Sequence, residues 1–309
     1  MKNCKTWYSL LVVLSSVILC SCSTEKRETL TSGSLTMMTS EDVFPVINIQ
    51  VGDFQRMYDE VKIKNFSVST REAVVHLIND SVPLIVCARE LNDEEKNVIA
   101  KNQLEVDSTK IAYDGVAVIV NQKNSLTKLT TDELSELLSG AKARWSQVQS
   151  SGLSSAVVVA MGDPNSGVAE FVKSRLVKNG MMTANVFPCS TSSEVLSVVS
   201  ERPNAIGFVS IAWLENMPKN ITVVEIGDPN FRRDSTVTAM EYFLPHQAHI
   251  YRKYYPLSRT IYIYSHNVGK GVGLGFTSFA ASSDGQKIIV SNRLVPATMP
   301  VRLVQLNTP

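Results

Sequence analysis

Short apolar runs alternate with stretches of helical periodicity along most of the chain. The runs at Leu35–Met38, Val61–Val68 and Pro83–Cys87 predict buried strands. Each is followed by a polar turn and then by apolar residues at helical spacing, as expected for a helix that starts with a cap. Repeated strand-to-helix units build a parallel sheet with helices on its faces. The pattern therefore predicts an α/β fold.

One such unit lies in the middle of the chain and combines structure with candidate chemistry. The apolar run Val157–Met161 breaks at Asp163-Pro164-Asn165, and apolar residues at helical spacing follow from Val168. Ser166 and Gly167 then stand at a helix N-terminus, where free N–H groups and the helix dipole favour a bound anion. The same residues also suit a simple helix cap. Both interpretations are kept.

The later patterns indicate a second α/β lobe. Ile111–Tyr113 and Val116–Val120 form two apolar runs that flank Asp114-Gly115. Leu126–Leu138 has helical spacing, and Ala205–Val209 predicts another buried strand. The order of these elements predicts two α/β lobes rather than one sheet.

The N-terminal segment has the features of a bacterial lipoprotein leader. Basic residues precede an apolar run over Leu10–Leu19 that is too short to cross a bilayer as a helix. Leu19-Cys20-Ser21-Cys22 resembles a lipobox, and Cys22 fits as the residue that carries lipid such as palmitate. We expect a signal peptide over 1–22, a tether over 23–32, and a protein anchored to the cell envelope and facing the periplasm or the exterior. Ordinary secretion with cleavage nearby is the alternative.

Charge and metal-binding residues narrow the function classes. The chain has 30 basic and 29 acidic residues and no basic tract, so nucleic acid is not an expected partner. Cys87 and Cys189 remain after the leader, and we predict two free, buried thiols, although pairing in an oxidising compartment stays open. His246 and His249 form the only close histidine pair and lack a neighbouring acid or cysteine. No metal or other cofactor is expected.

Several motifs occur in an order that carries a resemblance. They are Thr39-Ser40, the turn at Ser69, Ala88-Arg89-Glu90-Leu91, Tyr113-Asp114-Gly115 with the following Val116–Asn121, Leu129–Gly140, Trp145, Ser166-Gly167, Asn204–Ser210 and Tyr255-Pro256-Leu257-Ser258-Arg259. In this order, over nearly all of the mature chain, they resemble the phosphate-binding family of periplasmic solute-binding proteins. Members of that family are lipoprotein receptors that feed phosphate to ABC transporters.

The resemblance implies a class II periplasmic-binding-protein fold with a ligand cleft between two lobes. Lobe 1 would comprise 33–112 and 256–309, and lobe 2 would comprise 113–255. It also implies a binding protein rather than an enzyme, with phosphate or a similar oxyanion as ligand and the membrane subunits of an ABC transporter as partners. The ligand-binding residues carried over from the family are Ser40, Ser69, Thr70, Arg89, Ser166, Gly167 and Val168.

The chain departs from the family pattern at the cleft. No arginine stands just before Ser166, Val168 replaces a threonine, and Glu41 and Asp42 bring negative charge to the first loop. Arg71 is a candidate to supply the missing positive charge. A carboxylate acceptor, from Asp163 or Glu72, would favour protonated phosphate over sulfate. The alternatives are a sensor or scaffold lipoprotein with a changed pocket, and a serine hydrolase that uses Ser166.

Overall fold

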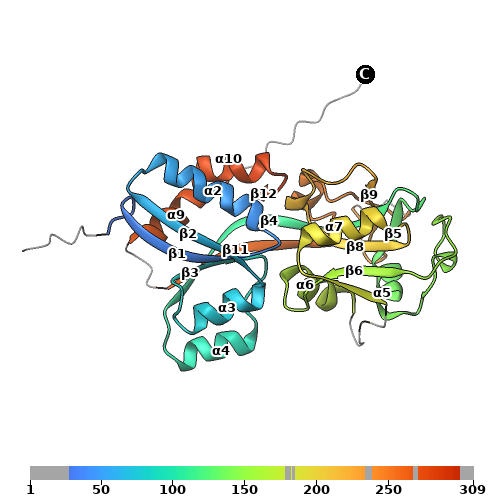
Figure 1. Cartoon of the computed structure of the whole chain (residues 1–309), viewed down its shortest axis with the longest axis horizontal. Coiled ribbons are helices and arrows are strands. Elements are labelled where there is room, and N and C mark those ends of the chain that lie inside the picture. Colours follow the sequence, from blue (N-terminus) through green and yellow to red (C-terminus); the bar gives the residue numbers. More distant parts are fainter. Residues whose placement is uncertain (1–27, 178–181, 183–184, 234–238, 267–270, 300–309) are drawn as a thin grey trace, which may run out of the picture.

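The computed structural model describes residues 28–177, 182, 185–233, 239–266 and 271–299 (Figure 1). The predicted leader, Cys22 and most of the tether lie outside these residues. Thr29 and Ser32, at the end of the predicted tether, form an isolated β-bridge. Within the described residues, no helix is both long enough and apolar enough to cross a membrane.

The first lobe is built on a five-stranded arrangement in the order β2-β1-β3-β11-β4. Strands β1, β2 and β3 are parallel, and β11 inserts antiparallel between β3 and β4. Its strands are β1 (Gly33–Ser40), β2 (Val61–Val68), β3 (Leu84–Cys87), β4 (Val106–Asn121), β11 (Ser258–His266) and the short β12 (Val295–Pro296). Its helices are α2 (Phe44–Met57), α3 (Thr70–Ile78), α4 (Asp93–Lys101), α9 (Gly271–Ala281) and α10 (Ser283–Ser291).

The second lobe repeats this arrangement in the order β7-β6-β8-β4, with β9 on the far side of β4. Here β6, β7 and β8 are parallel, and the later half of β4 is the inserted antiparallel strand. Its strands are β5 (Lys128–Thr130), β6 (Val158–Gly162), β7 (Val186–Cys189), β8 (Ala205–Ser210), β9 (Ile221–Val223) and β10 (Glu225–Gly227). Its helices are α5 (Thr131–Ser139), the 3₁₀ turns η2 (Trp145–Gln147) and η3 (Ile211–Trp213), α6 (Gly167–Leu176), α7 (Ser192–Glu201) and α8 (Gln247–Tyr251).

The two lobes lie side by side, and β4 and β11 run between them (Figure 1). Residues 106–115 of β4 pair with β11, whereas Val116–Val120 pair with β8. The predicted α/β fold with two lobes is confirmed. The change of partner falls close to the predicted boundary at 112/113, but the exact residue bounds of the lobes stay a prediction.

The two runs that flank Asp114-Gly115 are not separate elements, because β4 is one continuous strand through them. Asp114 is fully buried and bonded to Arg259 of β11. Gly115 lies where an added Cβ would be 2.8 Å from Ile250 Cδ1, so glycine is needed here for a close approach and not for a turn. Asp-Gly is a common turn signal, and tertiary contacts override it at this position.

The apolar core follows both sheets and contains the two remaining cysteines. Cys87 at the end of β3 and Cys189 at the end of β7 are both free and buried, which confirms the prediction of two unpaired thiols. Burial raises the pKa of the Cys87 thiol to about 12. Both behave as small core residues.

Candidate functional site

The carboxyl ends of the parallel strands in both lobes point toward the junction between the lobes. A cavity of about 230 Å³ lies there. It is lined by residues that follow four of these strands: Glu41 and Asp42 after β1, Ser69 after β2, Asp163 and Ser166 after β6, and Ser192 after β7. Open α/β sheets bind ligands at this edge. The cavity is therefore the candidate functional site.

Three helices begin beside this cavity, each with a hydroxyl cap. Ser69 Oγ accepts a hydrogen bond from Glu72 N (3.2 Å) at α3, and Ser166 Oγ accepts one from Ala169 N (3.2 Å) at α6. Thr191 caps α7 in the same way. The interpretation of Ser166 as a helix cap is thus correct. A hydroxyl that accepts in a cap keeps its own proton for a further bond, so capping and ligand binding are compatible.

Several polar groups meet at Gly167, the first residue of α6. A Cβ added to Gly167 would lie 2.6 Å from Thr70 Oγ1, 2.7 Å from Asp42 Oδ2 and 3.2 Å from Arg259 Nη1. Thr70 Oγ1 is also 2.7 Å from Ser40 Oγ. Gly167 therefore lets the N-terminus of α6 approach a hydroxyl pair and a guanidinium of the other lobe. Of the predicted ligand residues, the structure brings Ser40, Thr70 and Gly167 together.

A buried cation, Arg259, was not among the predicted ligands. Its Nε and Nη2 donate to Asp114 Oδ2 at 2.9 and 2.7 Å, and Ser210 Oγ donates to Asp114 Oδ1 at 2.8 Å. Burial alone would lower the pKa of Arg259, but the carboxylates of Asp42 and Asp114 outweigh it and raise that pKa. Arg259 therefore stays positively charged beside the N-terminus of α6.

The third nitrogen of Arg259 faces Asp42. Nη1 is 2.7 Å from Asp42 Oδ2, but the two groups are not aligned for a hydrogen bond. Both carboxylate oxygens of Asp42 and the Nη1 atom are buried and have no hydrogen-bond partner among the described residues. Buried polar groups are almost always satisfied, so these three atoms stand out as candidates for ligand contact.

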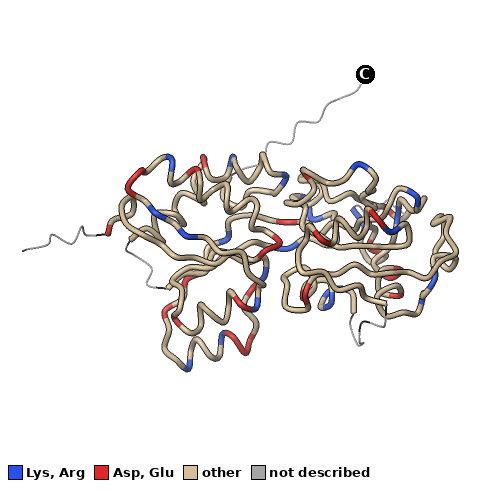
Figure 2. Tube along the Cα trace, viewed as in Figure 1, with Lys and Arg blue, Asp and Glu red and all other residues tan. Residues whose placement is uncertain are grey.

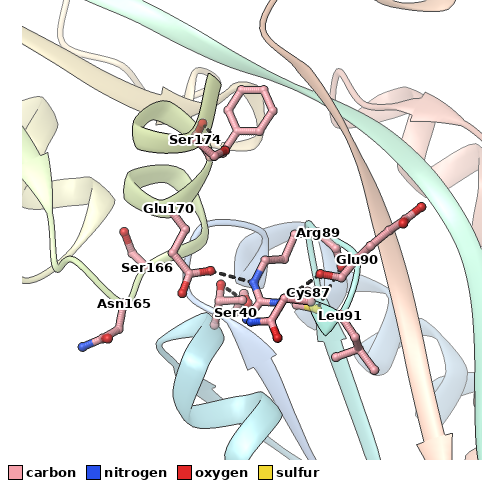
Figure 3. Close-up of polar contacts among 12 residues, drawn as sticks. Ser40, Cys87, Arg89, Glu90, Leu91, Asn165, Ser166, Glu170 and Ser174 are labelled. Carbon is pink, nitrogen blue, oxygen red and sulfur yellow. Dashed lines mark hydrogen bonds and ion pairs between the residues drawn. The ribbon is translucent and has the colours of Figure 1, made fainter. Parts of the chain in front are cut away.

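Arg89 is also at the lobe junction, but carboxylates occupy its guanidinium (Figure 3). Its Nε donates to Glu170 of α6 at 2.6 Å, and Nη1 and Nη2 donate to Glu95 at 2.8 Å each. Burial tends to lower the pKa of Arg89, but its hydrogen bonds to Glu95 and the negative charges of Glu170 and Glu95 raise that pKa overall. Arg89 thus links the lobes through Glu170. Its role as an anion ligand stays a prediction.

The remaining predicted residues differ in their relation to the cavity. Val168 and Asp163 line it. Asp163 Oδ1 accepts from Asn165 N at 2.8 Å, so this carboxylate also shapes its own loop. Arg71 and Glu72 have exposed side chains in the first turn of α3. The backbone N–H of Arg71 donates to Asn165 O (3.2 Å), which joins the loop of one lobe to that of the other.

The electrostatics of the cavity are unusual for an anion site. Glu41, Asp42 and Asp163 line it, and no Lys or Arg does so among the residues that the structure describes. Positive and negative positions both occur where the lobes meet (Figure 2). Arg259 lies behind Asp42, with Nη1 2.7 Å from Asp42 Oδ2. Arg259 could have been found in the sequence from the Tyr255–Arg259 motif, but its approach to Asp42 depends on the crossing of β11 and β4.

This geometry defines a class of protein: two α/β lobes joined by crossing strands, with polar loops and helix N-termini facing a cavity between them. A profile of the PBP superfamily domain matches residues 24–284. The chain therefore belongs to the PBP superfamily.

The chain is similar to known phosphate-binding proteins. It is 24% identical to the phosphate-binding protein PstS of Staphylococcus saprophyticus over 78% of this chain and 72% of that protein. It is 22% identical to PstS of Borreliella burgdorferi over 91% and 94%. These findings confirm the resemblance, and the names of these relatives agree with the prediction of a binding protein that is not an enzyme.

Solved structures support the fold assignment. A Clostridium perfringens protein described as a phosphate ABC transporter substrate-binding protein, with bound phosphate, aligns with a TM-score of 0.74. It is 20% identical and covers 86% of this chain and 100% of its own. An ABC-type phosphate transport receptor from Vibrio cholerae aligns with a TM-score of 0.66 at 20% identity, over 86% of this chain and 100% of its own. At these identities, the likeness establishes the fold.

Proposed function

We propose that this protein binds a small oxyanion, phosphate in the first place, between its two lobes and delivers it to the membrane subunits of an ABC transporter. The observation that carries this proposal is the meeting of Ser40, Thr70 and Arg259 with the first residue of α6. Hydroxyl donors, a guanidinium and a helix N-terminus at one point are the groups that bind oxyanions in proteins.

The similarity to phosphate-binding proteins supports phosphate within this class. Of the predicted ligands, Ser69, Ser166 and Val168 line the cavity, so the proposal keeps them. Arg89 and Arg71 stay predicted ligand contacts, and phosphate titration of variants at these two positions tests them. The lobes, 33–112 with 256–309 and 113–255, would hold the anion between them.

The proposal also includes the route to the membrane. The lipobox at Leu19–Cys22 supports a signal peptide over 1–22, acylation of Cys22, and a protein held at the cell envelope on its periplasmic or external side. One lipid-anchored receptor then samples the medium close to its transporter. The lipid anchor distinguishes such a receptor from a secreted protein that diffuses freely.

The test of the function is calorimetric titration of the extensively dialysed protein with phosphate and, separately, with sulfate. Phosphate near neutral pH carries a proton that it can donate to a carboxylate, whereas sulfate has none. Because the cavity is lined by carboxylates, we expect phosphate to bind and sulfate to bind at least about tenfold more weakly, which corresponds to about 1.4 kcal/mol. Absence of binding by both anions would contradict the proposal.

Two variants assign the carboxylate that causes this selectivity. Asp163→Asn should reduce the difference between the affinities for phosphate and sulfate, because Asp163 lines the cavity. Glu72→Gln is the matched control, since its exposed side chain lies in the first turn of α3 outside the cavity lining. If both variants change the ratio of phosphate to sulfate affinity equally, the selectivity comes from the overall electrostatic field of the protein and not from one acceptor carboxylate.

A further inference from the structure

The loop after β1 brings two neighbouring carboxylates to the helices of the other lobe. Glu41 Oε1 and Oε2 accept hydrogen bonds from Ser192 N (2.9 Å) and Ser192 Oγ (2.8 Å) at the start of α7. Asp42 Oδ2 lies against Gly167, where α6 begins. The N-termini of α6 and α7 thus each meet a carboxylate of the first lobe. Helix N-termini favour negative charge, so both contacts are attractive.

Asp42 occupies the place that an external anion would need. Its Oδ2 is 2.7 Å from Arg259 Nη1, which leaves no room for a ligand oxygen between them. The positions of Asp42 Oδ2 and Thr70 Oγ1 beside Gly167 leave no room there either, since both atoms are within 2.7 Å of the site of an added Cβ. An oxyanion that is to reach Arg259 and the N-terminus of α6 must first move this carboxylate.

The charges at this point also oppose the simple addition of an anion. Asp42, Asp114 and Arg259 are 2%, 0% and 6% exposed, so one cation is shared by two buried carboxylates. A second anion beside this group would add like charge in a region of low dielectric. Replacement of Asp42 by the ligand would instead keep the charge balance close to its present value.

The contact between Asp42 and Arg259 is suited to exchange. Arg259 is fixed through Nε and Nη2 by Asp114, so its position does not depend on Asp42. Nη1 and both oxygens of Asp42 have no hydrogen-bond partner among the described residues. A ligand oxygen aligned with Nη1 would satisfy a buried donor that Asp42 leaves unsatisfied.

We propose that Asp42 is a built-in competitor of the anionic ligand: with Glu41 it holds the two lobes together across the cleft, and an oxyanion binds by displacing it. The competition rests on the proposed function for its ligand, whereas the bridging of the lobes rests on the contacts of Glu41 and Asp42 alone. Affinity for the anion is then reduced by the fraction of protein in which Asp42 occupies the site.

The first test is the titration of Asp42→Asn with inorganic phosphate. The amide keeps the shape of the side chain and removes its charge, so phosphate should bind at least about tenfold more tightly than to the wild type. Asp284→Asn is the matched control, because it makes the same change at an exposed ion pair with Lys287 on α10. Its phosphate affinity should equal that of the wild type.

The second test measures the lobes without any ligand. Small-angle X-ray scattering of the dialysed wild type should give the same radius of gyration with and without phosphate. The double variant Glu41→Gln/Asp42→Asn should be more extended in the absence of phosphate, because the amide nitrogen of Gln cannot accept the second hydrogen bond from Ser192 and the charge of Asp42 at the N-terminus of α6 is removed. If Asp42→Asn does not fold, Glu41→Gln alone supplies the test, since its bonds to Ser192 are at the cavity edge.

The outcomes are distinct. Tighter binding by Asp42→Asn with extension of the double variant supports the inference. Weaker binding by Asp42→Asn makes Asp42 a contact of the ligand and overturns it. If no variant binds phosphate, the proposed function fails, and the scattering still decides the bridging: extension supports it, and an unchanged radius of gyration overturns it.

Discussion

At Gly167 the second lobe lies close against the buried charges of the first. An added Cβ would be 2.6 Å from Thr70 Oγ1 and 2.7 Å from Asp42 Oδ2, closer than real Cβ contacts. We predict that Gly167→Ala separates the lobes at this point and weakens phosphate binding by more than about tenfold, since the donors no longer converge. Calorimetry gives the affinity, and circular dichroism confirms that the fold is retained.

Gly52→Ala is the control for this change. Gly52 is in α2, and an added Cβ there would have no neighbour within 4 Å. Its phosphate affinity should match the wild type, and its stability should rise slightly because alanine favours the helix. If Gly167→Ala binds phosphate as tightly as Gly52→Ala does, the close approach at Gly167 is not needed for binding.

Glu41 gives the site a dependence on pH. Burial raises the pKa of Glu41, although its bonds to Ser192 act in the opposite direction. For a carboxyl group with a raised pKa in the folded state, stability is fully present below the unfolded value and is lost as pH rises through the folded pKa. Glu41→Gln is neutral throughout, so its melting temperature relative to wild type should be higher at pH 7 than at pH 4.

Thermal melts of both proteins at these two pH values check this expectation. Glu105→Gln, at an exposed position just before β4, is a suitable control for the loss of one carboxylate. If the difference in melting temperature between Glu41→Gln and the wild type is the same at both pH values, the charge of Glu41 does not lower the stability of the fold.

At the scale of elements, one buried ion pair links the side chains of β4 and β11, the two strands that run between the lobes. Asp114 of β4 accepts two bonds from Arg259 of β11 and one from Ser210 at the end of β8. Removal of one partner from a buried pair leaves an uncompensated charge. We predict that Asp114→Ala lowers the free energy of unfolding by about 3 kcal/mol, near the lower limit of such effects because Asp42 still faces Arg259.

Chemical denaturation measures this loss, with Asp107→Ala as the control at the start of the same strand, in a part of it that is exposed. Asp107→Ala should change stability by less than about 0.5 kcal/mol. A loss at Asp114 that is no larger than at Asp107 would mean that the ion pair does not stabilise the crossing.

The same elements show what the sequence can and cannot predict. The strands at Val61–Val68 and Leu84–Cys87, and the caps at Ser69 and Ser166, were recognised because periodicity and capping are local properties. The continuity of β4 was missed, because it depends on Arg259, which is 145 residues away from Asp114. Contacts of that separation leave no mark on local patterns.

The site follows the same division. The resemblance implied Ser40 and Thr70 as ligand residues, and the structure places them in one hydroxyl pair. The resemblance also implied Arg89, but it does not show that Glu95 and Glu170 bind the guanidinium of Arg89. That Asp42 faces Arg259 could not be predicted, since it requires the two lobes to be placed relative to each other.

At the scale of the molecule, contacts between the lobes come from loops at the carboxyl ends of strands. Glu41 with Ser192, Arg89 with Glu170 and Arg71 with Asn165 all join one lobe to the other. These contacts are polar and lie around a cavity, in contrast to the apolar packing within each lobe. Polar contacts of this kind can be exchanged for ligand contacts at small cost, which suits a molecule that must open and close.

The proposed anchor ties this two-lobed molecule to the envelope, and it leads to a prediction about one cysteine. Within Leu19-Cys20-Ser21-Cys22, Cys22 has a small residue before it, whereas Cys20 directly follows the bulky Leu19. We predict that Cys22→Ser abolishes labelling with radioactive palmitate and moves the protein from the detergent phase to the aqueous phase in Triton X-114 partitioning. Acyl chains supply the membrane affinity of a lipid-anchored receptor, so loss of all of them should move the protein completely to the aqueous phase.

Cys20→Ser is the matched control for the anchor, because it also replaces a cysteine sulfur by oxygen, two positions earlier in the same leader. It should keep both palmitate labelling and partitioning into detergent. If Cys22→Ser is still labelled and Cys20→Ser is not, Cys20 is the lipidated residue and the lipobox is misplaced by two positions. If the wild type itself takes up no label, the protein is secreted without lipid, and it would reach its transporter by diffusion rather than by confinement to the same membrane.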